Sequence, residues 1–180
     1  MQDYLENYGI KLEKLSYNKI ELVRRWRNDP KISQYMEFQS EISPEMQEKW
    51  FKSIDNDANL YYIIIYNHEE IGLINIKDID TRTGCGESGV FIYCDKYLNT
   101  DISYRAHLVL FDYYFLQLGY ESIKAHVRAF NKRASRFSAF LGCKQINTTD
   151  FFLTKEDYLS NKNRERFLKK FNILSNKTHE

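Results

Sequence analysis

The chain has 180 residues, with 26 basic and 25 acidic residues and a formal net charge of +1. That length fits one domain with a real core, and we expect a single domain over residues 1–180. Because the charges are interspersed, there is no broad basic field to follow a phosphate backbone, which argues against nucleic acid as the main partner.

The cysteines and the N-terminal segment bear on the compartment. Cys85, Cys94 and Cys143 are odd in number and lack C-x-x-C spacing, so neither a disulfide framework nor a zinc site is indicated. The first 15 residues are charged throughout, and no run approaches the roughly 20 apolar residues that span a bilayer. We therefore expect reduced thiols, no membrane association and a cytoplasmic protein.

The first third of the chain predicts one strand and two helices. Residues 10–16 alternate apolar and polar side chains, as in a half-buried strand, and are taken as the first strand. Residues 18–29 carry an apolar helical stripe that Asp29-Pro30 ends. A second helix begins at Ser43, a good N-cap followed by proline and glutamate.

The middle of the chain predicts an antiparallel meander. Residues 60–67 form an apolar run rich in β-branched and aromatic side chains, typical of a strand buried on both faces. Residues 68–70 are expected to form a hairpin turn, and residues 71–79 and 88–94 are expected to be the next two strands.

The second half predicts a crossover. A long helix from Ser103 to Gly119 is followed by a strand over 122–129 and a helix over 131–142. Such a connection requires parallel pairing, here of strands 88–94 and 122–129. Residues 151–159 are expected to be a last strand, and 161–171 a basic amphipathic helix with a solvated face.

Three segments together resemble a known family: "RRWRNDPKISQYM", "GESGVFI" and "NKRASRFSAFLG". With the helix from Ser43, they are similar to the GCN5-related N-acetyltransferase (GNAT) superfamily over roughly residues 10–145, in the branch of ribosomal-protein and pseudaminic-acid-pathway nucleotide-sugar acetyltransferases. The resemblance implies an α/β (α+β) fold with a mostly antiparallel central sheet, helices on both faces and a splayed parallel strand pair. It also implies acetyl-CoA as cosubstrate and no metal.

The loop before the long helix departs from the family pattern. Relatives carry Arg/Gln-Gly-x-Gly-x-Gly/Ala, whose backbone N–H groups approach the coenzyme pyrophosphate. Here the same positions hold Leu98, Asn99, Thr100, Asp101, Ile102 and Ser103. Two interpretations stay open: the loop binds the pyrophosphate, with the charge of Asp101 weakening affinity, or Asp101 or Ser103 only caps the helix.

The resemblance also suggests catalytic groups. The tyrosine that protonates the departing thiolate in relatives is replaced by Ser138. Glu87 matches a strand glutamate that activates the acceptor amine, although a lone strand carboxylate is more often only solvent-facing. Strand N–H groups near Phe91 to Tyr93 are expected to polarise the thioester carbonyl.

The family motif implies the following cofactor-binding residues: Phe91, Ile92, Tyr93, Leu98, Asn99, Thr100, Asp101, Ile102, Ser103, Tyr104, Asn131, Ala134 and Phe137. His107 and His126 lack a partner pattern and are interpreted as structural, and Cys94 is not expected to be a nucleophile.

The expected function is acetyl-CoA-dependent N-acetylation of a primary amine on a small molecule. An amino sugar nucleotide would need a basic pocket, for which Arg24, Arg25 and Arg27 are the nearby cations. The alternatives are a catalytically degenerate GNAT-fold binding protein and a protein N-terminal acetyltransferase. The oligomeric expectation is a monomer or homodimer.

Overall fold

A computed structural model describes residues 2–177, with side chains through residue 172. In this part of the chain one sheet has the order β1-β2-β3-β4-β5-β6-β8-β7, and β5 and β6 are its parallel pair. The strands are β1 Tyr4–Asn7, β2 Ile10–Lys14, β3 Leu60–Tyr66, β4 Glu69–Asp80, β5 Cys85–Ile92, β6 Ser122–His126, β7 Lys144–Gln145 and β8 Asp150–Thr154. The expected fold class is confirmed.

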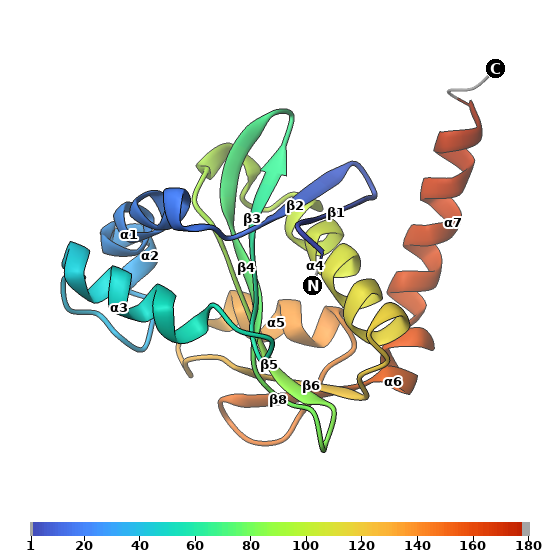
Figure 1. Cartoon of the computed structure of the whole chain (residues 1–180). Coiled ribbons are helices and arrows are strands. Elements are labelled where there is room, and N and C mark those ends of the chain that lie inside the picture. Colours follow the sequence, from blue (N-terminus) through green and yellow to red (C-terminus); the bar gives the residue numbers. More distant parts are fainter. Residues whose placement is uncertain (1, 178–180) are drawn as a thin grey trace.

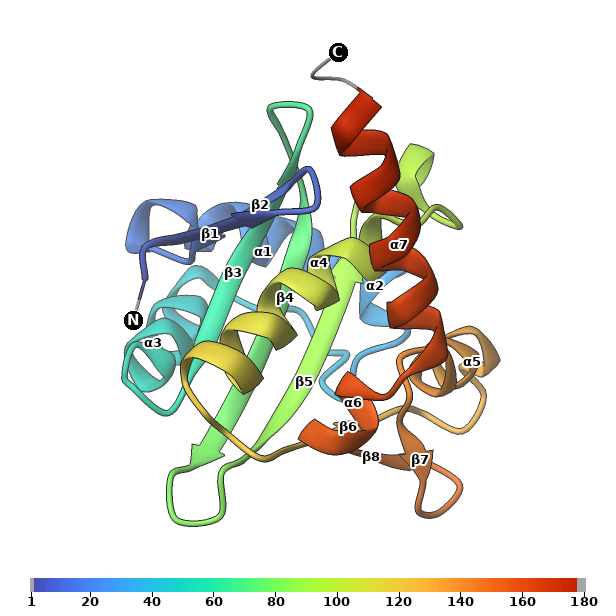
Figure 2. The same cartoon turned by 90° about the vertical axis from the view of Figure 1, so that its right-hand side faces the viewer.

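Helices cover both faces of this sheet (Figure 1). They are α1 Ile20–Asn28, α2 Pro30–Ser33, α3 Pro44–Ile54, α4 Ile102–Asp112, α5 Lys132–Phe140, α6 Lys155–Leu159 and α7 Lys162–Lys177. The first three lie on one face, whereas α4 lies on the other and is crossed by α7 (Figure 2). None of the helices in residues 2–177 combines the length and apolar character needed to cross a membrane.

Strand β3 shows why the sheet has two cores. Tyr62 and Ile64 belong to the apolar cluster under α4, while Tyr61 and Ile63 belong to the cluster under α1 and α3. Successive strand side chains point to opposite faces, so an unbroken apolar run serves both layers. This confirms the expectation for residues 60–67.

The N-terminal part of the sheet differs from the expectation in two ways. Strand β1 precedes the predicted first strand and pairs with it through a tight turn at Tyr8 and Gly9, both at positive φ (52° and 68°). The second hairpin turns at Asn67 and His68, also at positive φ, so residues 69 and 70 are already in β4. Both central residues of a type I′ hairpin turn have positive φ. Gly9 and Asn67 favour that conformation, whereas Tyr8 and His68 do not indicate it.

The two parallel strands have other bounds than the sequence predicted. Strand β5 begins at Cys85 rather than 88, and β6 ends at His126 rather than 129. Gly86 lies inside β5. A side chain is not tolerated at this position, because a Cβ there would come 2.5 Å from Cγ2 of Ile76. The glycine therefore allows close packing within a strand and does not interrupt it.

The elements of the second half are partly as expected. Helix α4 continues as a π-helical turn, Tyr113–Gln117, before Gly119 at φ 76°. The predicted strand 151–159 is instead β8 followed by α6, because Thr154 caps a helix by accepting the N–H of Asp157 (3.0 Å).

One carboxylate joins distant segments of the chain. Asp112, in α4, accepts hydrogen bonds from the hydroxyls of Tyr8 (2.6 Å) and Tyr158 (2.7 Å), and from the Arg164 guanidinium (2.9 Å). Phe167 of α7 packs edge-on against Tyr8. The tail helix therefore buries an apolar stripe and is not only a solvated element.

Candidate active site

The parallel strands β5 and β6 pair over only three residues. Cys85–Glu87 lie opposite Ser122–Lys124, and β6 pairs along its whole length with β8 on its other side. The remainder of β5, through Ile92, pairs with β4 alone. The two strands therefore diverge, and within residues 2–177 this part of the β5 edge lacks a strand partner. The gap between the two diverging backbones is called the opening below.

The N–H groups along this edge alternate in direction. Tyr93 donates its N–H to the carbonyl of Ile71 (2.7 Å), on the β4 side. In an antiparallel ladder neighbouring residues point their N–H groups to opposite sides, so that of Ile92 faces the opening and that of Phe91 faces β4. Of the three residues expected to polarise a carbonyl, only Ile92 presents its N–H there.

The loop before α4 does not cap the helix as expected. Asp101 stands at the N-cap position, but its side chain accepts no N–H from the helix. It forms an ion pair with Arg105 instead (3.2 Å). The Thr100 hydroxyl accepts the N–H of Ile102 (3.3 Å), and no cap bond from Ser103 is found in the described residues. Arg105 competes for the carboxylate because it lies one helical turn away.

The rest of the loop divides between core and solvent. Ile102 and Tyr104 are buried, and Leu98 packs partly against the same core, so these three side chains support the helix. Asn99 is exposed and at φ 64°, the left-handed conformation that glycine would adopt freely, whereas Asp101 is at φ −81°. Of the two positions, only that of Asn99 has the backbone conformation for which a glycine would be favoured.

Helix α5 lies against α4. Asn131 caps it by accepting the N–H of Ala134 (3.0 Å), and Phe137 packs edge-on against His107 at 5.0 Å between ring centroids. Ser138 is 7% exposed, and its hydroxyl makes no hydrogen bond with the described residues. Burial lowers the pKa of His107 to about 4, which agrees with a structural role.

Glu87 lies on the opposite face from α4. The neighbouring Gly86 faces the α4 core, and strand alternation places Glu87 on the side of α1 and α3. Its carboxylate forms an ion pair with Lys77 at 3.0 Å. Burial raises the pKa of Tyr61, on the same face, to about 12. The charge of Glu87 also raises this pKa, and the charge of Arg27 lowers it.

Arg27 has no acidic partner in the part of the chain that the structure describes. Its guanidinium lies 5.8 Å from the centroid of the Trp50 ring, and burial lowers its pKa. Among the described residues no carboxylate comes within ion-pair distance of it, whereas Arg24 of the same helix is paired with Glu21. A partly desolvated, unpaired guanidinium favours the approach of an anion.

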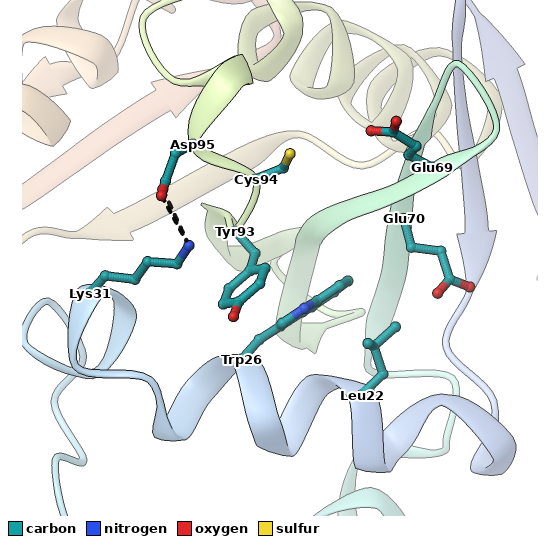
Figure 3. Close-up of a pocket in the computed structure, with 8 residues that line it drawn as sticks. All are labelled: Leu22, Trp26, Lys31, Glu69, Glu70, Tyr93, Cys94 and Asp95. Atoms are coloured by element: carbon teal, nitrogen blue, oxygen red, sulfur yellow. Dashed lines mark hydrogen bonds and ion pairs between the residues drawn. The ribbon is translucent and has the colours of Figure 1, made fainter.

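A pocket of about 520 Å³ opens beside the end of β5 (Figure 3). Tyr93 forms its wall: the ring stacks on Trp26 at 5.5 Å, the ammonium of Lys31 lies 3.9 Å from the ring centroid, and the hydroxyl donates to Asp29 (3.2 Å). Its other lining residues are Leu22, Glu69, Glu70, Cys94 and Asp95. Sequence reasoning marked Tyr93 but missed Trp26 and Lys31, although both lie in the "RRWRNDPK" segment.

The acidic residues around this pocket are already neutralised. Glu69 pairs with Lys96, Glu70 with Lys19, and Asp95 with Lys31. In the described residues no cluster of three histidine, cysteine or carboxylate side chains could hold a metal ion.

Comparison with known proteins decides the family. Residues 10–144 match the family model described as an acetyltransferase (GNAT) domain. The chain belongs to the GNAT family of acetyltransferases. This confirms the resemblance inferred from the three sequence segments.

Two curated relatives from Campylobacter jejuni are both described as acetyltransferase PseH, each 31% identical over 70 residues. The match covers 38% of this chain and 44% of those proteins, so the chain spans less than half of their length. It agrees with the pseudaminic-acid-pathway branch expected from the sequence.

Solved structures share the fold at low identity. A spermidine N-acetyltransferase from Vibrio cholerae, in complex with CoA and spermine, has a TM-score of 0.74 at 19% identity, covering 86% of this chain and 100% of that one. A structure described as a putative acetyltransferase from T. thermophilus has a TM-score of 0.72 at 17% identity, covering 91% of this chain and 95% of that one.

Proposed function

We propose that the protein transfers the acetyl group of acetyl-CoA to the primary amine of a nucleotide-linked amino sugar. The coenzyme supplies the thioester on which the amine acts. The opening between β5 and β6 is where we place its extended arm, because within residues 2–177 the edge of β5 there lacks a strand partner to which its backbone groups could bind. The N–H of Ile92 is available to polarise a carbonyl in this opening.

The N-terminus of α4 supports the same placement. Its free N–H groups favour an anion at the helix tip. The carboxylate of Asp101 opposes this less than its bare charge suggests, since it is paired with Arg105. Asn99, Thr100 and Asp101 are the exposed residues that would lie nearest a pyrophosphate.

The unpaired Arg27 is the observation that favours a nucleotide-linked acceptor. A diphosphate would supply the anion that this guanidinium lacks, whereas a polyamine would bring a further cation to it. The carboxylates of the Tyr93 pocket are paired with lysines and so offer little attraction to a polycation. The acceptor site would lie on the α1 face, between Arg27, Glu87 and Tyr93.

An acceptor screen tests the proposal. Acetyl-CoA is incubated with a UDP-linked amino sugar, the same sugar without nucleotide, spermidine, or a peptide with a free N-terminus, and released thiol is measured. We expect the nucleotide-linked sugar to give the highest kcat/KM. Arg27→Gln should raise KM for that acceptor about tenfold or more and leave the free sugar unaffected. Arg25→Gln, exposed on the same helix, is the matched control.

Other outcomes would select the alternatives. A best rate with the peptide would indicate an N-terminal acetyltransferase. Binding of acetyl-CoA with no amine acetylated would favour a catalytically degenerate binding protein, for which the replacement of the family tyrosine by Ser138 is the reason. Absence of acetyl-CoA binding at millimolar concentration, with the protein folded, would refute the proposal itself.

A further inference from the structure

His126 lies on the rim of the opening between β5 and β6. It is the last residue of β6, two residues beyond Lys124, where pairing with β5 ends. Ile123 is buried in the α4 core, so alternation along the strand turns Lys124 and His126 toward the face of α1 and α3. The Nε2 atom of His126 accordingly lies 3.5 Å from the carboxylate of Glu37, in the segment between α2 and α3.

Asp150 fixes the orientation of this imidazole. The residue is opposite His126 on β8, and its carboxylate lies 2.6 Å from Nδ1. Hydrogen bonds from His126 and from Asn147 lower the pKa of Asp150, which keeps it an acceptor. A carboxylate at this distance requires the proton on Nδ1, so the neutral ring carries its lone pair on Nε2.

Glu87 is less suited to accept a proton. Its carboxylate is held by Lys77 at 3.0 Å, and it must leave this ion pair before it can serve as a base. His126 is on the same face and on the strand across the opening, with its basic nitrogen turned toward an exposed loop. Building on the function proposed above, we propose that His126, positioned by Asp150, is the general base of acetyl transfer.

The protons balance as follows. The acceptor ammonium gives one proton to Nε2 of His126, directly or through a water, and its freed lone pair attacks the thioester carbon. The tetrahedral intermediate expels the coenzyme thiolate as the carbon–sulfur bond breaks, and the second proton of the attacking nitrogen passes to the sulfur. The imidazolium then releases its proton to solvent. No hydroxyl acid at position 138 is required, which fits the buried serine there.

The charged groups facing His126 are Asp150, Glu37 and, on its own strand, Lys124. Glu37 has a side chain 71% exposed, so it can move aside when an acceptor binds without losing buried contacts.

The substitution His126→Asn distinguishes a role of His126 as general base from a purely structural role. The asparagine amide nitrogen can occupy the position of Nδ1 and retain the hydrogen bond to Asp150, while the acceptor at Nε2 is lost. We expect kcat/KM for the preferred amine at pH 7 to fall about 100-fold, with the dissociation constant for acetyl-CoA unchanged. The deficit should shrink as pH rises toward the pKa of the acceptor amine, and added imidazole should restore part of the rate.

His68→Asn is the matched control, because His68 lies in the distant β3–β4 turn at φ 63°, a conformation that asparagine tolerates. Glu87→Gln is assayed beside it. If the wild-type protein acetylates the amine and His126→Asn is equally active, the role of His126 is overturned, whereas the proposed function stands. A large loss in His126→Asn that neither higher pH nor imidazole relieves would also overturn that role. A wild-type protein that acetylates no amine would instead overturn the proposed function and this inference together.

Discussion

Replacing Asp101 by asparagine should tighten the binding of acetyl-CoA. The carboxylate is 61% exposed at the tip of α4, and its neutralisation removes a like charge from the expected phosphate position while freeing Arg105. A single charge near an exposed helix terminus changes the free energy by about 0.3 to 1 kcal/mol, which corresponds to roughly two- to fivefold in affinity. Asp101→Gly should gain no more, because φ at this residue is −81° and glycine is not needed there.

The same change should lower stability. It removes an (i, i+4) ion pair worth about 0.3 to 0.5 kcal/mol and a favourable charge at the helix N-terminus, but no cap hydrogen bond. Isothermal titration calorimetry with acetyl-CoA at low and moderate salt, together with thermal melting, measures both effects. The affinity gain should diminish as salt increases. Asp57→Asn, in an exposed loop, is the control.

A flat affinity accompanied by a lower melting temperature would refute the reasoning. The loop would then serve only to begin α4, and the coenzyme phosphates would have to lie elsewhere.

Two further predictions concern stability. His107 is buried with a pKa lowered to about 4, so the unfolded chain binds its proton first and stability should fall as pH decreases from about 6.5 to 4, by up to about 3 kcal/mol. His107→Phe should flatten this part of the profile in urea unfolding measured across pH; an unchanged slope would contradict the assignment. Asp112→Asn should cost about 2 to 4 kcal/mol, since it leaves Arg164 and one tyrosine hydroxyl without their acceptor. Glu165→Gln, which breaks only an exposed pair with Lys169, should hardly change the same urea midpoint, and equal effects would show that the Asp112 cluster is not special.

Local signals in the sequence predicted the elements whose causes are local. Ser43 caps α3 by accepting the N–H of Met46 (3.2 Å), and Asn131 caps α5, both as expected. Capping by Asp101 was wrong because residue type does not decide between two partners, and Arg105 was the stronger one. The turn at Tyr8 was missed because a tyrosine at positive φ carries no turn signal of its own.

The active-site features that sequence could not supply depend on contacts between distant segments. The parallel pairing covers only Cys85–Glu87 of β5, and the apolar pattern of β5 alone does not indicate where its pairing with a strand 37 residues later begins or ends. The contact between His126 and Asp150 spans 24 residues and joins two strands, so neither residue alone indicates it. In the sequence Arg27 does not differ from other helical arginines. It is distinguished only in the structure, where no carboxylate among the described residues lies near it.

The Asp112 cluster has a consequence for the order in which this chain can fold. Tyr8 is 104 residues before Asp112, and Arg164 is 52 residues after it, yet all three side chains meet. During synthesis Tyr158 and Arg164 leave the ribosome last. Until they have been synthesised, the carboxylate of Asp112 in α4 lacks part of its hydrogen-bond donors. Contacts of such long sequence separation also slow folding, because the entropy of closing the loops is lost before the contacts stabilise the structure. Docking of α7 is therefore expected to be a late step that completes the α4 side of the molecule.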